Sequence, residues 1–88
     1  MKNIFIISCS YDASQLNNYL DSLSNTKKLF DNTWLIADDT TAQSLYDKLE
    51  PYIDKSSSNR ILVVKLTKER HGWHSKSVWE WLKENESE

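Results

Sequence analysis

The sequence lacks the cysteines for an internal disulfide bond, because Cys9 is the only cysteine among its 88 residues. A lone thiol behind no recognisable signal peptide favours a reducing compartment, so we expect a cytoplasmic protein. No apolar run approaches the roughly 20 residues that a membrane-spanning helix needs, and we expect no membrane partner. One glycine and one proline in the whole chain, with 11% aromatic residues, indicate a packed domain rather than a disordered one.

The sequence also lacks a strong excess of either charge. Eleven basic and thirteen acidic residues leave a formal net charge of −2, whereas nucleic-acid-binding domains are usually basic. A local basic patch is still compatible with this balance. The length predicts a single domain over residues 1–84, with residues 85–88 as a frayed C-terminal tail.

Short apolar runs alternate with amphipathic segments along the chain. Apolar, β-branched residues predict strands at 4–7, 27–30, 33–37 and 61–66. Apolar residues at helical spacing predict helices after Asp12, over 41–53 and over 77–84, the last with Ser77 and Glu80 at capping-box positions. Asp31 and Asn32 suit the positive φ angles of a tight hairpin turn between the second and third strands.

This order of elements predicts the fold class. Strand, helix, hairpin, helix and strand follow one another as in a split βαβ unit. We therefore expect an α+β domain with a ferredoxin-like βαββαβ sheet and an additional C-terminal helix.

Three of the strands carry apolar residues on both faces. A sheet covered by helices on one face alone should alternate apolar and polar residues, so both faces are expected to be buried. The second face could be covered by the C-terminal helix or by a second copy of the chain. We favour a homodimer to which the C-terminal segment contributes, with Trp73, Trp79 and Trp81 at the dimer interface.

The arrangement of buried residues and turns resembles a known family. The segments that carry the likeness are 32–38, 41–53, 61–66, Gly72-Trp73 and 81–83. They resemble the SinR-like family, small proteins similar to the CRISPR-associated adaptation dimer protein and to the VapD-type endoribonucleases, over roughly residues 2–84. The resemblance implies a ferredoxin-like homodimer. In nuclease-like members an aspartate at the end of the first strand can hold a divalent metal near the dimer axis.

In this chain that position falls near Cys9, and the nearest aspartate is Asp12. Asp12 is thus the one candidate metal ligand, and no other cofactor is expected. Its spacing to Gln15 also fits a capping box, in which Asp12 would cap the first helix. The segment 38–41 is expected to supply the caps of the second helix. Asp38 and Asp39 within it could form a carboxylate pair at a strand end, and the alternative is a turn with the N-cap of that helix.

No catalytic residue is assigned from the sequence. Cys9 would need a nearby base to act as a nucleophile, and it is better interpreted as a small buried hydrophobic residue at a strand end. His71 and His74 supply only half of a zinc site, and Gly72 between them argues against a helix that would align them.

The stretch from residue 65 to 76 mixes basic and aromatic residues. Basic side chains can follow a phosphate backbone while aromatic rings stack on bases, so this stretch is the candidate nucleic-acid interface, with Lys65, Lys68, Arg70 and Lys76 as contacts. A solvated loop, with Trp73 packed into a core or dimer seam, is the alternative.

These observations predict a small nucleic-acid-associated dimer with little or no catalysis. The first alternative is a protein-interaction module, an inhibitor or accessory subunit without a nucleic-acid role. The second alternative, a metal-dependent endoribonuclease, ranks last because no acid, base and nucleophile converge in the linear pattern.

Overall fold

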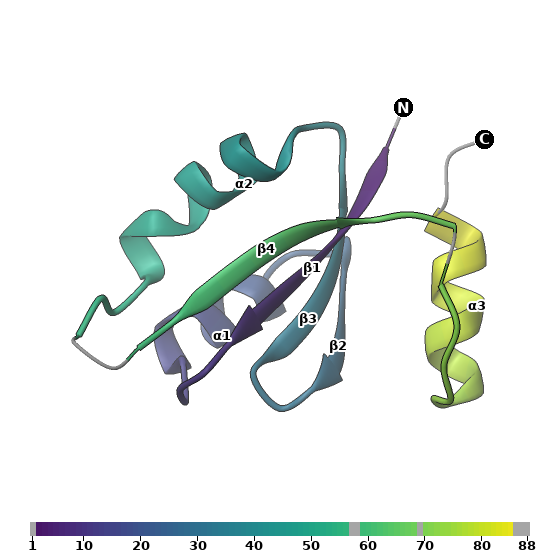
Figure 1. The fold of residues 1–88 in the computed structure, drawn as a ribbon, viewed down its shortest axis with the longest axis horizontal. Coiled ribbons are helices and arrows are strands. Elements are labelled where there is room, and N and C mark those ends of the chain that lie inside the picture. Colours follow the sequence, from purple (N-terminus) through teal and green to yellow (C-terminus); the bar gives the residue numbers. More distant parts are fainter. Residues whose placement is uncertain (1, 57–58, 69, 86–88) are drawn as a thin grey trace.

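The computed structural model describes residues 2–56, 59–68 and 70–85 as a four-stranded sheet with three α-helices (Figure 1). In chain order the elements are β1 (Asn3–Cys9), α1 (Ser14–Asp21), β2 (Thr26–Phe30), β3 (Thr33–Asp38), α2 (Ala42–Leu49), the 3₁₀ turn η1 (Glu50–Tyr52), β4 (Ile61–Leu66) and α3 (Lys76–Asn85). All seven predicted strands and helices are present. Pro51 lies in η1, where the missing N–H of proline ends the regular helix.

The strands lie in the order β2-β3-β1-β4, and every neighbouring pair is antiparallel. The α+β class is therefore confirmed, and this arrangement is consistent with the predicted ferredoxin-like sheet. No helix among the described residues is long and apolar enough to cross a membrane.

Helices α1 and α2 cover one face of the sheet. The side chains of Phe5, Ile7, Trp34 and Ile36 alternate along the two central strands and point toward these helices. They pack against the helical residues Leu16, Leu20, Leu45 and Leu49, and all eight side chains are buried. This cluster is the main hydrophobic core of the domain.

Helix α3 covers part of the other face. Val78 and Leu82, one turn apart on α3, pack against Ile4, Leu35 and Ala37 in a second buried cluster. The prediction that both sheet faces are apolar is thus confirmed for this part of the sheet. On β4, however, Leu62 and Val64 remain 63% and 44% exposed on the same face.

The hairpin and the helix starts differ in detail from the prediction. Among the described residues only Asn32, not Asp31, has a positive φ, at 61°, and Leu29 is an extra residue in the β2–β3 register. The first helix starts after Ala13 with no side-chain cap, so the prediction that Asp12 caps it is wrong. The second helix is capped by Thr41, whose side chain accepts from the Ser44 N–H, so the prediction that the segment 38–41 supplies its cap is confirmed. Within that segment the N-cap is neither Asp38 nor Asp39.

The last helix starts at Lys76, one residue earlier than predicted. It also includes Asn85, the first residue of the predicted frayed tail. The N–H groups of Val78 and Trp79 donate hydrogen bonds to the carbonyl oxygen of Ser75, which precedes the helix. Residues 86–88 of the predicted tail lie outside the described residues.

Candidate functional site

The predicted basic interface is divided between the two faces of the sheet. Lys65 stands opposite Phe5 in the β1–β4 register, so both side chains point to the α1/α2 face. The next residue, Leu66, points to the α3 face and packs against the second cluster. The Lys65 ammonium group is therefore directed away from the α3 face, on which Arg70, one of the other three predicted contacts, lies.

Those three contacts are spread along the chain that follows β4. This chain runs back beside α3 before the helix begins, and Lys76 stands at its far end, at the start of α3 (Figure 1). Lys68 is exposed, while the Arg70 guanidinium group donates to the carbonyl oxygen of Thr67 at 2.8 Å. The structure thus brings Lys68 and Arg70 into one short turn and leaves Lys76 apart from them.

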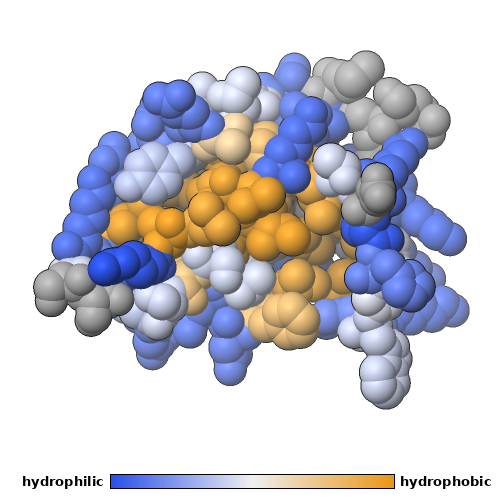
Figure 2. All heavy atoms as spheres, viewed as in Figure 1, coloured by the Kyte–Doolittle hydropathy of each residue, from blue (hydrophilic) through white to orange (hydrophobic). Residues whose placement is uncertain are grey.

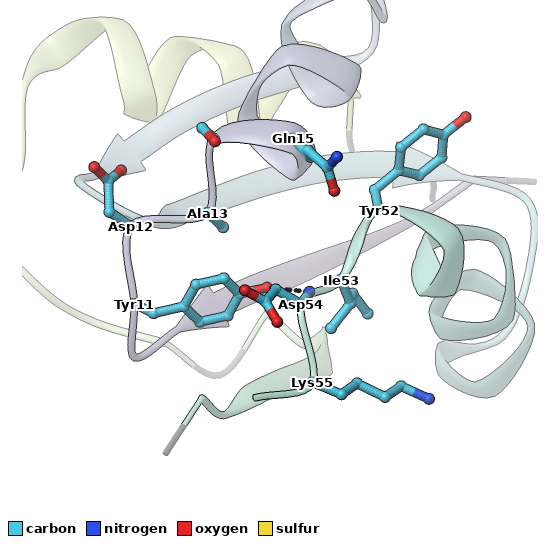
Figure 3. A pocket seen from close by; sticks show the side chains of 9 residues that line it. Tyr11, Asp12, Ala13, Gln15, Tyr52, Ile53, Asp54 and Lys55 are labelled. Carbon is cyan, nitrogen blue, oxygen red and sulfur yellow. Dashed lines mark hydrogen bonds between the residues drawn. The ribbon is translucent and has the colours of Figure 1, made fainter. Parts of the chain in front are cut away.

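Asp12 lines an open polar pocket of about 500 Å³ beside the start of α1 (Figure 3). The Tyr11 hydroxyl accepts from the Asp54 N–H at 3.1 Å, and the Asp54 carboxylate closes a local turn by accepting from the backbone and the hydroxyl of Ser56. The Asp12 carboxylate points away from Asp54, and Lys55 extends out of the pocket. A hydrogen bond to the Glu50 carboxylate raises the pKa of Lys55.

This pocket does not fit the divalent metal that the resemblance implies. Hard cations such as Mg²⁺ take several oxygen ligands in near-octahedral geometry. No group of three or more His, Cys, Asp or Glu residues in the described part of the chain is placed to hold a metal ion. The other carboxylate among the described residues that line the pocket, Asp54, does not face Asp12 (Figure 3).

Cys9 does not have the surroundings of a nucleophile. It packs against the α1/α2 core at the end of β1, and this burial raises the pKa of its thiol. Both histidines lie with the α3 cluster on the other face, so neither stands beside Cys9 as a base. A raised pKa disfavours the thiolate, which agrees with a structural role.

His74 is held by hydrogen bonds at both ring nitrogens. Its Nε2 lies 2.7 Å from the carbonyl oxygen of Leu29, and its Nδ1 accepts from the Ser75 N–H at 2.8 Å. Because both nitrogens are used within the chain, His74 is not available to form a zinc site with His71.

An apolar groove lies between the sheet and α3, and we call it the α3 groove. It has a volume of about 260 Å³, and the residues that matter here are Ile6, Phe30, Leu35, Leu66, Trp73 and Trp79. Trp79 and Trp81 are half-buried against the chain's own second cluster, whereas Trp73 is 99% exposed at the mouth of the groove. Sequence reasoning missed this groove, although apolar residues on both strand faces were its signal.

A second apolar surface follows β4. Apolar atoms gather over this strand in the centre of the face shown in Figure 2. Strand β4 ends the sheet, and no described strand pairs with its outer edge. Leu62 and Val64 are the exposed apolar side chains beside that edge.

Comparison of the chain with protein-family models, curated proteins and solved structures finds no match in any of the three.

Proposed function

We propose that this chain is a non-enzymatic, cytoplasmic protein-interaction module that forms a homodimer through its edge strand β4. The observation that carries the proposal is the exposure of Leu62 and Val64 beside the outer edge of β4. An uncovered edge strand presents a row of N–H and C=O groups that can pair with another strand. Native edges usually avoid this by charge, proline or a bulge, and β4 has only Lys65 to do so.

The hydrogen-bond pattern gives the orientation of this edge. The Ser10 N–H donates to the Arg60 carbonyl, and antiparallel pairs alternate between bonded and non-bonded along a ladder. Leu62 and Val64 therefore direct their backbone groups toward β1. The backbone groups of Ile61, Val63 and Lys65 face outward, where a second strand would meet them.

A two-fold axis through Val63 satisfies these outward groups. In that register Val63 pairs with Val63 of the second copy, and Ile61 pairs with the copy's Lys65. Leu62 then lies opposite the copy's Val64 in a non-bonded pair, the closer of the two pair types, so apolar side chains meet across the axis. A register centred on Lys65 would place two like charges opposite each other, which is destabilising. Because β4 is the last strand of the sheet in each copy, pairing two β4 strands would join the two sheets into one continuous sheet.

This function is better supported than the two alternatives. Phosphate binding would need its cations on one surface, and Lys65 lies on the opposite face from Arg70. A metal-dependent endoribonuclease would need converging metal ligands, and the described residues include no group of three or more His, Cys, Asp or Glu placed to hold a metal ion.

Light scattering after size-exclusion chromatography tests the dimer. At high micromolar concentration the wild type is expected to give twice the chain mass of 10.3 kDa and to shift toward the monomer on dilution, because strand pairing buries less area than most stable interfaces. The double variant Leu62→Lys, Val64→Lys should be monomeric at every concentration, since it places lysines opposite each other in the paired register. Its melting curve should still be cooperative.

Phe30→Lys is the matched control. Phe30 is 60% exposed on the other edge strand, β2, so this variant makes the same apolar-to-lysine change away from β4. It should remain a dimer. A wild type that is monomeric at all concentrations, a double variant that still dimerises, or a dimer lost only in Phe30→Lys would each overturn the proposal.

A further inference from the structure

The α3 groove is a second apolar surface, separate from the β4 edge. The proposal below rests on the function as a protein-interaction module but needs no particular oligomeric state. Leu35 and Leu66 line the groove from the sheet, and Trp79 lines it from α3. The chain between β4 and α3 closes the remaining side with Trp73.

The size of the groove limits what can occupy it. Pockets for small molecules and cofactors usually enclose about 300–1,000 Å³. At about 260 Å³ and open to the surface, this groove is smaller than that range. Such a volume suits one large apolar side chain that a longer ligand inserts as an anchor.

The charge around the groove indicates what should flank that anchor. Arg70 and His71 belong to the lining, Lys68 precedes them, and no acidic residue lines the groove among the described residues. Glu80 lies on α3, but Val78 and Leu82 are the buried residues of that helix, so Glu80 is on its exposed side. Glu69 stands between Lys68 and Arg70 in the sequence, so residues 68–71 carry a net charge of +1 with the histidine neutral, in a chain whose net charge is −2.

Trp73 gives the groove a large contact that the fold itself does not use. Its side chain is 99% exposed, in contrast to the half-buried Trp79 and Trp81. Tryptophan and arginine are the residue types that most often dominate binding energy at interfaces. Here Trp73 and Arg70 stand on the same segment at the groove.

We propose that the α3 groove binds an acidic peptide segment that inserts one large apolar side chain. The anchor contacts Leu35, Leu66 and Trp79, Trp73 packs over it, and a carboxylate beside it meets the exposed Lys68. A peptide fits better than a nucleic acid because the lining is largely aliphatic, whereas bases carry polar edges that this groove does not satisfy. A single Arg–Lys turn also offers few contacts to a phosphate backbone.

Fluorescence polarisation with a designed probe tests this inference. The probe is a short labelled peptide with one phenylalanine flanked on both sides by glutamates. Control probes carry a serine in place of the phenylalanine or lysines in place of the glutamates, and a labelled oligothymidylate tests nucleic acid. We expect only the acidic apolar probe to bind, with an affinity that falls as salt is raised.

Two variants and a matched control locate the site. Trp73→Ala should weaken binding of the probe about tenfold or more, as expected of an aromatic anchor contact. Lys68→Glu should weaken it severalfold through the lost charge pairing, while Lys83→Glu, the same change on the exposed side of α3, should leave it unchanged. Equal affinity of wild type and Trp73→Ala, equal binding of the serine control, or tighter binding of oligothymidylate would overturn the proposal.

The same titration on the Leu62→Lys, Val64→Lys variant separates the two proposals. It should bind the peptide as the wild type does, because neither residue belongs to the lining. If the wild type binds the peptide but is monomeric at every concentration, the β4 dimer is contradicted and the groove proposal stands. If the wild type dimerises but does not bind the acidic apolar probe, the groove proposal is contradicted and the β4 dimer stands.

Discussion

The Nε2 atom of His74 lies 2.7 Å from the backbone carbonyl oxygen of Leu29, a residue 45 positions earlier in the chain. This hydrogen bond joins the segment before α3 to the edge strand β2. Because the Ser75 N–H donates to Nδ1 at 2.8 Å, the ring proton is on Nε2 and is donated to Leu29. The Phe30 ring packs against the imidazole, with ring centroids 5.0 Å apart.

His74→Ala should release this segment from β2. The lost hydrogen bonds and ring contact are expected to lower the free energy of unfolding by about 1 kcal/mol. Hydrogen exchange at residues 70–75 should become faster, and urea denaturation should give the stability change. His71→Ala is the control, because His71 is exposed, and it should change neither measurement. Equal effects of the two substitutions would contradict the role of the Leu29 contact.

Alanine substitutions at the two helix starts should differ in their effect on stability. Thr41→Ala removes the side chain that accepts from the Ser44 N–H, and should destabilise the domain by about 1 kcal/mol. Asp12→Ala should stay within about 0.5 kcal/mol of the wild type, because Asp12 does not cap α1. Thermal denaturation of both variants measures the contrast. A larger loss for Asp12→Ala than for Thr41→Ala would restore the capping interpretation of Asp12.

The hairpin turn should tolerate glycine better than a branched residue. Asn32 has φ of 61°, a region that glycine reaches without strain and that β-branched residues avoid. Asn32→Gly is expected to be neutral within about 0.5 kcal/mol, and Asn32→Val to cost about 1–2 kcal/mol. Urea denaturation gives both values, and equal stability of the two variants would argue against a strained turn.

The raised pKa of Cys9 predicts slow alkylation. Only the thiolate reacts with iodoacetamide, and burial against the α1/α2 core favours the neutral thiol. At neutral pH the rate should be below that of free cysteine. The rate should also rise at higher pH than for the free amino acid, because the pKa is shifted upward. In urea the two rates should converge, and a native rate as fast as that in urea would show that Cys9 is not protected.

The sequence by itself determined the elements and their order. Alternating apolar runs, helical spacing and the Asp31-Asn32 turn are local patterns, and each acts over a few neighbouring residues through backbone sterics and side-chain burial. The apolar strands also indicated, correctly, that the second sheet face needs a cover. The helix caps were less predictable. Asp12, Asp38 and Asp39 are all residue types that suit an N-cap, and which residue takes that position depends on where the backbone becomes helical.

Only the tertiary structure decided what covers that second face and what stays open. The choice depends on contacts between segments far apart in the chain, such as Leu82 with Leu35 or His74 with Leu29, which no local pattern encodes. The same contacts divide the predicted basic stretch, because successive residues of β4 point to opposite faces and Lys65 leaves the face that carries Arg70. They also leave Leu62 and Val64 exposed, because the α3 cluster reaches Leu66 at one end of β4 and does not cover the rest of that strand. Trp73 is exposed on the segment before α3.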